Sequence, residues 1–462
     1  MNLIIFAGIM GVVMMFGGLL MKQKHQATLL ATVLVLLLLA GNTWEMLHGP
    51  IFSIQAPHML ATSRFGLLIN EILLAAGLLY LLVSGRDIEK VGNYVAEYYA
   101  LIFFIFAGIG ISTAYTNLLM LFLGIEIISI PLYILTGADK RNLKSIEAAL
   151  KYFLMGSFST GIMLMGIALI YGGTGSFLLE KFSLQGAPIS YNLVAGLLLI
   201  LVAMAFKVSA APFHFWTPDV YDGAPTVFTS FMATIVKVAG FIAFIRLFEG
   251  ASGIIAGKWQ WVIAIIISLT LLIGNITAVF QQSVKRMLAY SSIAQAGFMM
   301  FALFSMNNWG REGIVLYAAA YCLATIGIFA VLTKMDDYTY QGFNGFARRE
   351  PMLAVALAVM VLSLAGIPLT VGFFSKYYMV ASAVAAGFGG KFLWLLVLAM
   401  LCAAVSVYYY FRVIQAMYFK EAEQPQSALP VSAGFRYLVA GAALVVVLLG
   451  ILPQWLLQFL YF

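Results

Sequence analysis

Four ionisable residues stand inside long apolar stretches of this chain, where charge is unfavourable. They are Glu126, Lys207, Lys237 and Lys376. A charged side chain at the centre of a bilayer costs at least about 2.5–3.5 kcal/mol. Loss of hydration disfavours the charged forms of lysine and glutamate, so that such residues can exchange protons near neutral pH. Three lysines and one carboxylate at membrane depth therefore predict a proton relay.

A structural role is the alternative for each of these residues. A lone lysine can reach the interface with its long side chain, or it can form a static ion pair. Lys207 lies nearest to the end of its apolar run, whereas Lys237 lies near the middle of its own. Three of the four have a proline close in sequence: Pro131, Pro212 and Pro368. Four charges together, three of them near a proline that can disturb a helix, favour function over structure.

His214 is a fifth candidate, at the end of an apolar run and flanked by Phe213, Phe215 and Trp216. An aromatic belt at the membrane interface would explain it. A proton-relay position would explain it equally well, and both interpretations stay open.

The elements that position these residues are membrane-spanning helices. The chain has 462 residues, of which 63% are hydrophobic and 9% charged, whereas soluble domains carry about 25% charged residues. A membrane helix needs about 20 apolar residues, and fourteen apolar runs can be distinguished along the sequence. The run 351–385 is too long for one straight span and contains Gly366, Pro368 and Gly372. We therefore predict an all-α polytopic membrane protein of about 14 transmembrane helices, with the twelfth broken in mid-membrane.

The distribution of basic residues predicts the orientation. Odd-numbered loops carry sixteen Lys and Arg residues, from Lys22 in the first loop to Arg436 near the last. Even-numbered loops carry six: Arg64, Lys181, Arg246, Lys258, Arg311 and Lys391. Because cytoplasmic loops carry the excess of positive charge, the odd loops are expected in the cytoplasm and both termini on the other side.

The charged residues also indicate an internal repeat. Helices 4–8 hold a glutamate, a lysine beside a proline and a midplane lysine, and helices 9–13 hold a polar helix start and a proline-broken helix with Lys376. Five crossings per unit is an odd number, so the second unit is inverted, as in many transporters. We expect three N-terminal helices in 1–95, the two units in 96–250 and 251–420, and a C-terminal helix in 421–462.

Redox and nucleotide chemistry have no support in this chain. The two cysteines and four histidines are scattered, without a CxxC or HExxH motif, and an iron–sulfur cluster needs about four ligands. No glycine-rich phosphate-binding motif follows a strand. The net charge of +7 lies in loops and forms no basic face, so no nucleic-acid partner is expected.

Four stretches together resemble the antiporter-like membrane subunits of respiratory complex I. They are LGIEIISIPLY at 123–133, FKVSAAPFHFWTPDVYDGAP at 206–225, VKRMLAYSSI at 284–293 and LAGIPLTVGFFSK at 364–376. The resemblance runs in order from about residue 95 to 420. One departure is Thr226-Val227, where the family often has Pro-Val.

The resemblance implies fourteen helices in two inverted five-helix units, with broken helices 7 and 12. It implies a proton-translocating subunit of a bacterial NADH:quinone oxidoreductase in the inner membrane, with its termini on the periplasmic side. By motif position, Glu126 pairs with Lys207, Lys237 is the central lysine, and Lys376 passes protons towards the exit. NADH, FMN, iron–sulfur clusters and quinone are then expected in partner subunits. The expected partners are the other complex I subunits, above all adjacent antiporter-like ones, together with membrane lipids.

Two other functions are compatible with parts of this pattern. A subunit of a multi-subunit cation/proton antiporter would share the Glu/Lys/Lys pattern, although the WTPDVY segment at 216–221 favours the complex I form. A passive scaffold subunit would not need charges at membrane depth. Dependence of transport on sodium would favour the antiporter, and substitution of the charged residues would test the scaffold.

Overall fold

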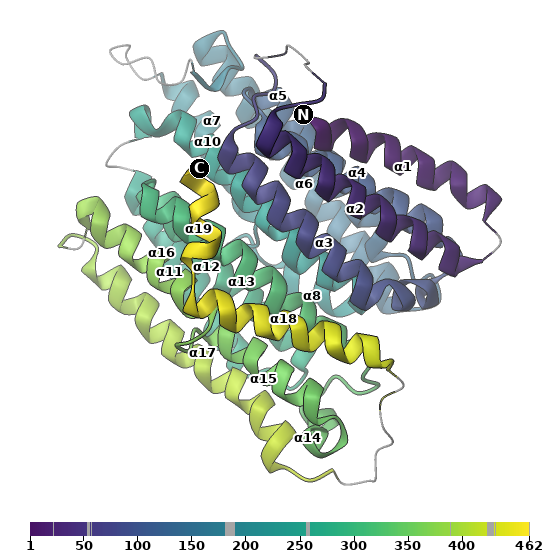
Figure 1. Ribbon diagram of the computed structural model, residues 1–462. Helices are drawn as coiled ribbons and strands as arrows, with labels where there is room; N and C mark the ends of the chain where they lie inside the picture. Colours follow the sequence, from purple (N-terminus) through teal and green to yellow (C-terminus); the bar gives the residue numbers. More distant parts are fainter. Residues whose placement is uncertain are drawn as a thin grey trace.

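Apolar helices make up most of the chain in the computed structural model (Figure 1). It describes all residues except 22, 53–55, 57, 181–189, 256–258, 389, 423–428, 430 and 462, and it leaves out the side chains of 250–255 and 388. Lys22, Lys181 and Lys258, which enter the charge count above, therefore lie outside the described residues.

Twelve helical segments in the described part are long and apolar enough to cross a membrane. Eleven of them are single α-helices: α1 (Asn2–Leu20), α2 (Lys24–His48), α3 (Arg64–Val91), α4 (Val95–Ala114), α5 (Leu118–Thr136), α6 (Leu143–Thr174), α11 (Trp259–Val279), α12 (Val284–Ser305), α13 (Asn308–Leu332), α17 (Leu393–Phe419) and α18 (Ala433–Ile451). The remaining segment, which is the eighth span in chain order, consists of α9 (Thr226–Phe231), the π-helical turn η2 (Met232–Val236) and the beginning of α10 (Lys237–Ile255). Helices satisfy their own backbone hydrogen bonds, which lipid cannot do.

Two further spans are broken, which brings the number of crossings to the expected fourteen. The seventh consists of α7 (Tyr191–Lys207) and α8 (Trp216–Gly223), and the twelfth of α15 (Pro351–Ala365) and α16 (Val371–Ala383). Proline cannot donate a backbone hydrogen bond, and Pro212 and Pro368 lie in the two breaks. Each break also holds a non-glycine residue with positive φ, Ser209 at 64° and Leu369 at 72°. Such backbone strain is concentrated at functional sites.

Four short elements remain in the described part of the chain. They are the 3₁₀ turn η3 (Gln341–Phe343), α14 (Phe346–Arg349), the π-helical turn η4 (Val384–Phe388) and α19 (Gln454–Tyr461). The last apolar stretch of the chain holds two helices, α18 and α19. Pro453 separates α18 from α19, because its ring and missing N–H do not continue a helix.

The two five-helix units repeat the same packing. Helix α4 packs along α5 in the first unit, as α11 packs along α12 in the second. Similarly, α6 packs against α7 and α8, and α13 packs against α15 and α16. Since each unit crosses five times, the second is inverted relative to the first. Helices α1 to α3 form a layer beside the first unit, and α18 crosses over α13 and α15 (Figure 1).

Contacts near the helix ends group the odd loops at one end of the molecule and the even loops at the other. Odd loops meet one another, for example where Lys24 Nζ donates to the Gly92 carbonyl at 2.7 Å and Lys334 pairs with Asp87. Even loops also meet, because Arg246 Nη2 donates to the Ala61 carbonyl at 3.1 Å. The chain therefore has two distinct ends, one for each set of loops.

Candidate functional site

The expected Glu126–Lys207 pair is formed by α5 and the last residue of α7. Lys207 Nζ lies 3.8 Å from Glu126 Oε1 and donates to Ser129 Oγ at 2.9 Å. Glu126 Oε1 accepts a hydrogen bond from Thr160 Oγ1 on α6 at 2.7 Å. The two charged side chains are only 9% and 18% exposed. Glu126 and Ser129 are three residues apart, which places them on one face of α5.

Lys237 is buried without a carboxylate partner among the described residues. It is the first residue of α10, directly after η2, and only 3% of it is exposed. Its Nζ donates to both the carbonyl and the Oγ of Ser292 on α12, each at 2.9 Å. The Tyr221 ring lies 5.8 Å from Nζ. A π-helical turn inside an α-helix is often found at a functional site.

A row of aromatic rings connects the surroundings of Lys207 with those of Lys237. The row consists of Tyr133, Tyr152, Trp216 and Tyr221. Tyr152 and Trp216 stack with centroids 4.6 Å apart, and Trp216 Nε1 donates to the Phe206 carbonyl at 3.0 Å. This last bond runs from α8 to α7 and so joins the two halves of the broken seventh helix. The row of rings therefore holds the break between α7 and α8 in position relative to Lys207 and Lys237.

Lys376 binds the end of the other broken helix. Its Nζ donates to the carbonyls of Leu364 at 2.8 Å and Ala365 at 3.0 Å. These are the last residues of α15, where carbonyls lack intrahelical donors and the helix dipole favours a cation. Lys376 is buried, and its Nζ lies 4.9 Å from the centre of the Phe298 ring. The break therefore provides the site that holds the lysine.

A line of buried polar side chains on α12 reaches the environments of both Lys237 and Lys376. Ser292 binds Lys237, and Gln295 Nε2 donates to the Leu364 carbonyl at 2.9 Å, the same oxygen that Lys376 binds. Gln295 also donates to the Tyr410 hydroxyl at 3.1 Å.

Two short contacts and a cavity complete this line. The Tyr410 hydroxyl contacts Ser291 Oγ, and the Tyr317 hydroxyl donates to Gln295 Oε1. A small cavity beside Lys376 is lined by Gln295, Tyr317, Tyr321 and Ser375, among others. The sequence indicated a polar start to this helix but not that its side chains contact Lys237 and the carbonyl that Lys376 binds. The spacing of Ser291, Ser292 and Gln295 within an apolar run was the available signal.

His214 does not join this line within the described residues. It lies in the turn between α7 and α8, is 6% exposed, and stacks on Phe215 with ring centroids 4.8 Å apart. Because His214 is buried, it does not occupy an exposed position in an aromatic belt at the membrane interface. No described contact connects it to Glu126 or to the three lysines, so its role as a relay stays a prediction.

A second charged cluster lies at the end of the molecule that carries the odd loops. Asp219 on α8 pairs with Lys151 at 3.0 Å and with Arg286 at 3.1 Å. Lys285, counted as a loop residue in the sequence, lies instead in the first turn of α12 and is 3% exposed. Its Nζ donates to the Asp222 and Ala224 carbonyls, each at 2.8 Å. It therefore caps α8, because α8 ends at Gly223.

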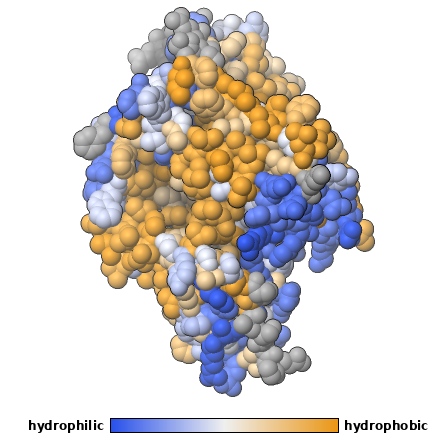
Figure 2. All heavy atoms as spheres, turned by 45° about the vertical axis from the view of Figure 1, so that its right-hand side comes forward, coloured by the Kyte–Doolittle hydropathy of each residue, from blue (hydrophilic) through white to orange (hydrophobic). Residues whose placement is uncertain are grey.

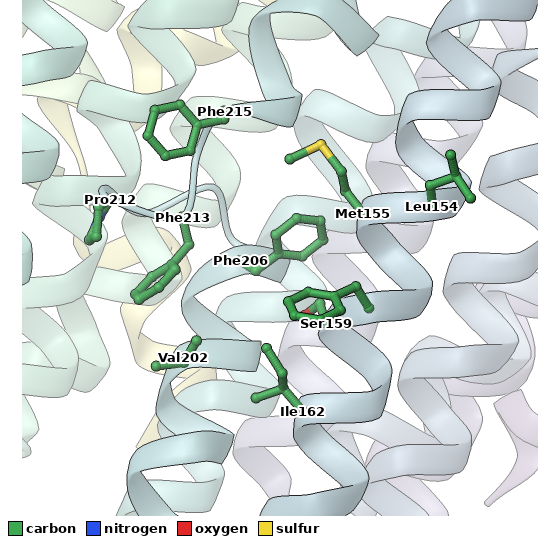
Figure 3. Close-up of a pocket in the computed structure, with 10 residues that line it drawn as sticks. Leu154, Met155, Ser159, Ile162, Val202, Phe206, Pro212, Phe213 and Phe215 are labelled. Carbon is green, nitrogen blue, oxygen red and sulfur yellow. The ribbon is translucent and has the colours of Figure 1, made fainter.

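A larger groove beside the seventh helix contains none of these groups. Figure 3 shows its walls, formed by side chains of α6, α7 and the turn that follows α7. The groove measures about 390 Å³, and Ser159 is the one residue with a polar side chain among its lining residues. Ser159 Oγ lies 3.4 Å from the Ala203 carbonyl, to which it donates. The groove therefore offers packing surface and no proton-transfer chemistry.

The fold and site define a class of protein. Inverted repeats with discontinuous helices and buried charges near the breaks are typical of ion-translocating membrane proteins. Among the described residues, no group of three or more His, Cys, Asp and Glu could hold a metal ion.

The chain belongs to the family described as NADH:quinone oxidoreductase/Mrp antiporter, transmembrane, whose model matches residues 115–422. The NADH-quinone oxidoreductase subunit N of Trichlorobacter lovleyi is 40% identical over 86% of this chain and 82% of its own length. The subunit N of Cytophaga hutchinsonii is 36% identical over 99% of both chains.

Solved structures agree with this assignment. A chain of respiratory complex I from Thermus thermophilus with bound aureothin is 32% identical, with a TM-score of 0.84, over 99% of this chain and 98% of that chain. A chain of the Mrp complex from Dietzia is 17% identical, with a TM-score of 0.88, over 99% and 95%. At that identity the second likeness concerns the fold alone.

Proposed function

We propose that this chain is a proton-translocating membrane subunit, of the subunit N type, of an NADH:quinone oxidoreductase. The observation that carries the proposal is the buried Glu126–Lys207 pair at 3.8 Å, together with two buried lysines that have no carboxylate partner among the described residues. A fixed scaffold would not need unbalanced charges at membrane depth, because each is unfavourable there. NADH, FMN, iron–sulfur clusters and quinone belong to partner subunits, and so does the redox chemistry.

Proton transfer follows from changes in one ion pair. When Glu126 and Lys207 are close, the carboxylate balances the lysine charge. When the pair opens, the positive charge of Lys207 is no longer balanced and repels the proton held by Lys237. An opposite charge within about 4–6 Å strongly favours the charged form of a buried group, so opening and closing the pair changes proton occupancy.

The proton released by Lys237 passes along α12 to Lys376. Ser292 receives hydrogen bonds from Lys237, and Gln295 shares the Leu364 carbonyl with Lys376. Hydroxyl and amide groups of this line can rearrange their hydrogen bonds during the transfer. Lys376 then releases the proton towards the exit side. His214 is retained as a further candidate relay residue near the break in the seventh helix.

The orientation follows from the charge bias. The odd-loop end is the cytoplasmic end of a bacterial inner-membrane protein, because it carries sixteen of the loop Lys and Arg residues and positive loops stay inside. Both termini are then periplasmic. The chain divides into 1–95, the units 96–250 and 251–420, and the C-terminal segment 421–462. Adjacent antiporter-like subunits and the other complex I subunits are its partners.

The first test is purification of the intact complex from native membranes, followed by a spectrum and an NADH–quinone assay. Flavin and iron–sulfur signals with NADH oxidation would support the proposal. A colourless complex whose proton exchange depends on sodium or potassium would instead identify a cation/proton antiporter subunit.

The second test is the substitution Lys237→Ala in the assembled complex. Proton uptake by inverted vesicles should be lost, whereas the complex should still assemble. Lys140→Ala provides a control, since Lys140 is an exposed lysine at the odd-loop end. Unchanged pumping in Lys237→Ala would contradict the relay.

A further inference from the structure

A groove with apolar walls and a basic rim lies between α2, α3 and the beginning of α18. It measures about 540 Å³, within the range of about 300–1,000 Å³ that is typical of small-molecule sites. In Figure 1 the beginnings of α2 and α18 and the end of α3 lie on the same side of the molecule. Figure 2 brings this side forward and shows hydrophilic residues gathered next to a broad hydrophobic surface. The groove is remote from the relay and uses none of its residues.

The rim carries positive charge that is not fully balanced. His25, Arg86, Lys90 and Lys334 line the groove. Two of these lysines share one carboxylate, because Asp87 lies 3.0 Å from Lys90 Nζ and also pairs with Lys334.

The other two basic residues of the rim differ in their partners. His25 faces Glu89 at 3.6 Å. The exposed Arg86 side chain has neither an ion pair nor a hydrogen bond within the described part of the chain. An anion at the rim would therefore meet a free guanidinium beside a lysine-rich cluster.

Backbone donors of α18 face the same rim. Ser432 is the N-cap of this 19-residue helix and accepts from the Phe435 N–H at 3.2 Å, and Ser432 and Gly434 line the groove. The first N–H groups of a helix have no intrahelical acceptors, and the dipole favours negative charge there. Arginine, lysine and a helix N-terminus together suit a phosphate group.

The walls below the rim suit acyl chains. Leu29 is 61%, Val33 is 45% and Leu82 is 46% exposed, and all three line the groove. From His25 to Val33 the helix rises by about 12 Å, so the apolar wall extends well below the rim. On α2 and α3 the charged residues stand at the odd-loop end and the apolar ones further in, with Thr28 and Thr32 interspersed among the latter on α2.

We propose that this groove binds one anionic phospholipid, with its phosphate at Arg86 and the start of α18 and its acyl chains along α2 and α3. A basic pocket between membrane helices on the positively charged side is suited to an acidic head group. A helix of another subunit fits less well, because it is a rigid rod of about 10 Å diameter, whereas the acyl chains of a lipid can extend out of the groove along the exposed apolar side chains of α2 and α3.

The test is photocrosslinking of the assembled complex in phosphatidylcholine vesicles that contain a minority of phosphatidylglycerol. A trace of phosphatidylglycerol with a diazirine on its acyl chain is the probe, and the same label on phosphatidylcholine is the reference. Adducts mapped by mass spectrometry should fall on α2 and α3 around Leu29, Val33 and Leu82, and they should be stronger for phosphatidylglycerol. This comparison uses the unaltered complex and so does not depend on how a variant folds.

Variants then test the head-group contact. Arg86→Gln should lower labelling by phosphatidylglycerol about five-fold, the effect of one basic residue on binding to an anionic surface. Arg86→Lys should retain most of the labelling. The matched control is Arg141→Gln, because Arg141 is also exposed at the odd-loop end and lies outside the groove.

Three results would overturn the proposal. Labelling that is the same for both head groups and unaffected by Arg86→Gln would indicate ordinary surrounding lipid. If inorganic phosphate competes with the lipid head group, and the acyl-chain adducts show no preference for α2 and α3, the groove is a site for a phosphate ion. Absence of lipid adducts, with crosslinks from this groove to another subunit, would show that a protein covers it.

Discussion

Substitution of Glu126 by glutamine provides the most direct test of the relay. The change keeps the shape of the side chain and removes its charge. At the observed separation of 3.8 Å between Lys207 Nζ and Glu126 Oε1, the interaction of two unit charges is about 4 kcal/mol at an effective dielectric constant of about 20. This energy corresponds to a factor of about 1,000 in the equilibrium between the closed and open pair.

Solvent does not reduce this value greatly. The lysine is 9% and the carboxylate 18% exposed, and removal of one partner from a buried pair typically costs about 3–5 kcal/mol. Lys207 would keep its hydrogen bond to Ser129, which supplies no negative charge. In the variant the charge of Lys207 should therefore stay unbalanced, as it is when the pair is open. Lys237 should then no longer alternate between holding and releasing its proton.

The assay compares two activities of inverted membrane vesicles. NADH-driven proton uptake, followed with a pH-gradient dye, should fall by about ten-fold or more, since the pair contributes several times the 1.4 kcal/mol that equals one factor of ten. Reduction of ferricyanide by NADH should be unchanged, because it does not require the membrane relay. The ratio of the two separates a coupling defect from failure to assemble.

A matched variant and a double variant complete the design. Glu147→Gln removes a carboxylate from an exposed pair with Lys151 at 2.7 Å, and such surface pairs are worth about 0–1 kcal/mol, so pumping should persist. The double variant of Glu126→Gln and Lys207→Gln should be no worse than Lys207→Gln alone, because interacting residues are not additive. Independent, additive effects, or normal uptake in Glu126→Gln, would refute the role of the pair.

Three further substitutions test the surroundings of the relay. Gln295→Leu should lower NADH-driven proton uptake with little loss of assembly, because it interrupts the polar line and removes hydrogen bonds worth about 0.5–1.5 kcal/mol each; full uptake would contradict this path. Gly372→Ala should destabilise the complex by about 1–3 kcal/mol, measured by thermal denaturation, because its Cβ would overlap the Ser363 carbonyl. Lys285→Met should increase amide hydrogen exchange at the end of α8, because two carbonyl caps are lost; unchanged exchange would contradict the capping role.

The sequence was sufficient to predict the spans and the main charged residues. An apolar run long enough to cross a membrane has few alternatives to a helix, and charges within it are conspicuous. Gly366, Pro368 and Gly372 marked the break in the twelfth span, whereas the break in the seventh was expected only from the resemblance. A proline alone is not a sufficient signal, because Pro131 stands inside α5 without ending it. The Glu126–Lys207 contact was expected only through the resemblance, since no spacing rule relates two residues on different helices.

The tertiary surroundings of the lysines could not be predicted from the sequence. The bond from Gln295 to the Leu364 carbonyl joins α12 to α15, and its partners Tyr317 and Tyr410 come from two further helices. Lys285 was counted among loop residues, because a basic residue at the edge of an apolar run is usually exposed. Its burial results from the end of α8, whose free carbonyls lie within reach of its amine.

The two breaks suggest why lysines, rather than neutral donors, stand beside them. A broken helix in the membrane leaves carbonyls without donors, and Lys376 provides donors for two of them at the end of α15. Its charge also interacts with the helix dipole, by about 0.3–2 kcal/mol. Loss of the proton would remove that attraction while the amine keeps part of its hydrogen bonding. Because the same atom holds the proton and the helix end, a change in protonation must alter the stability of the break, and movement of the break must alter the affinity of Lys376 for its proton.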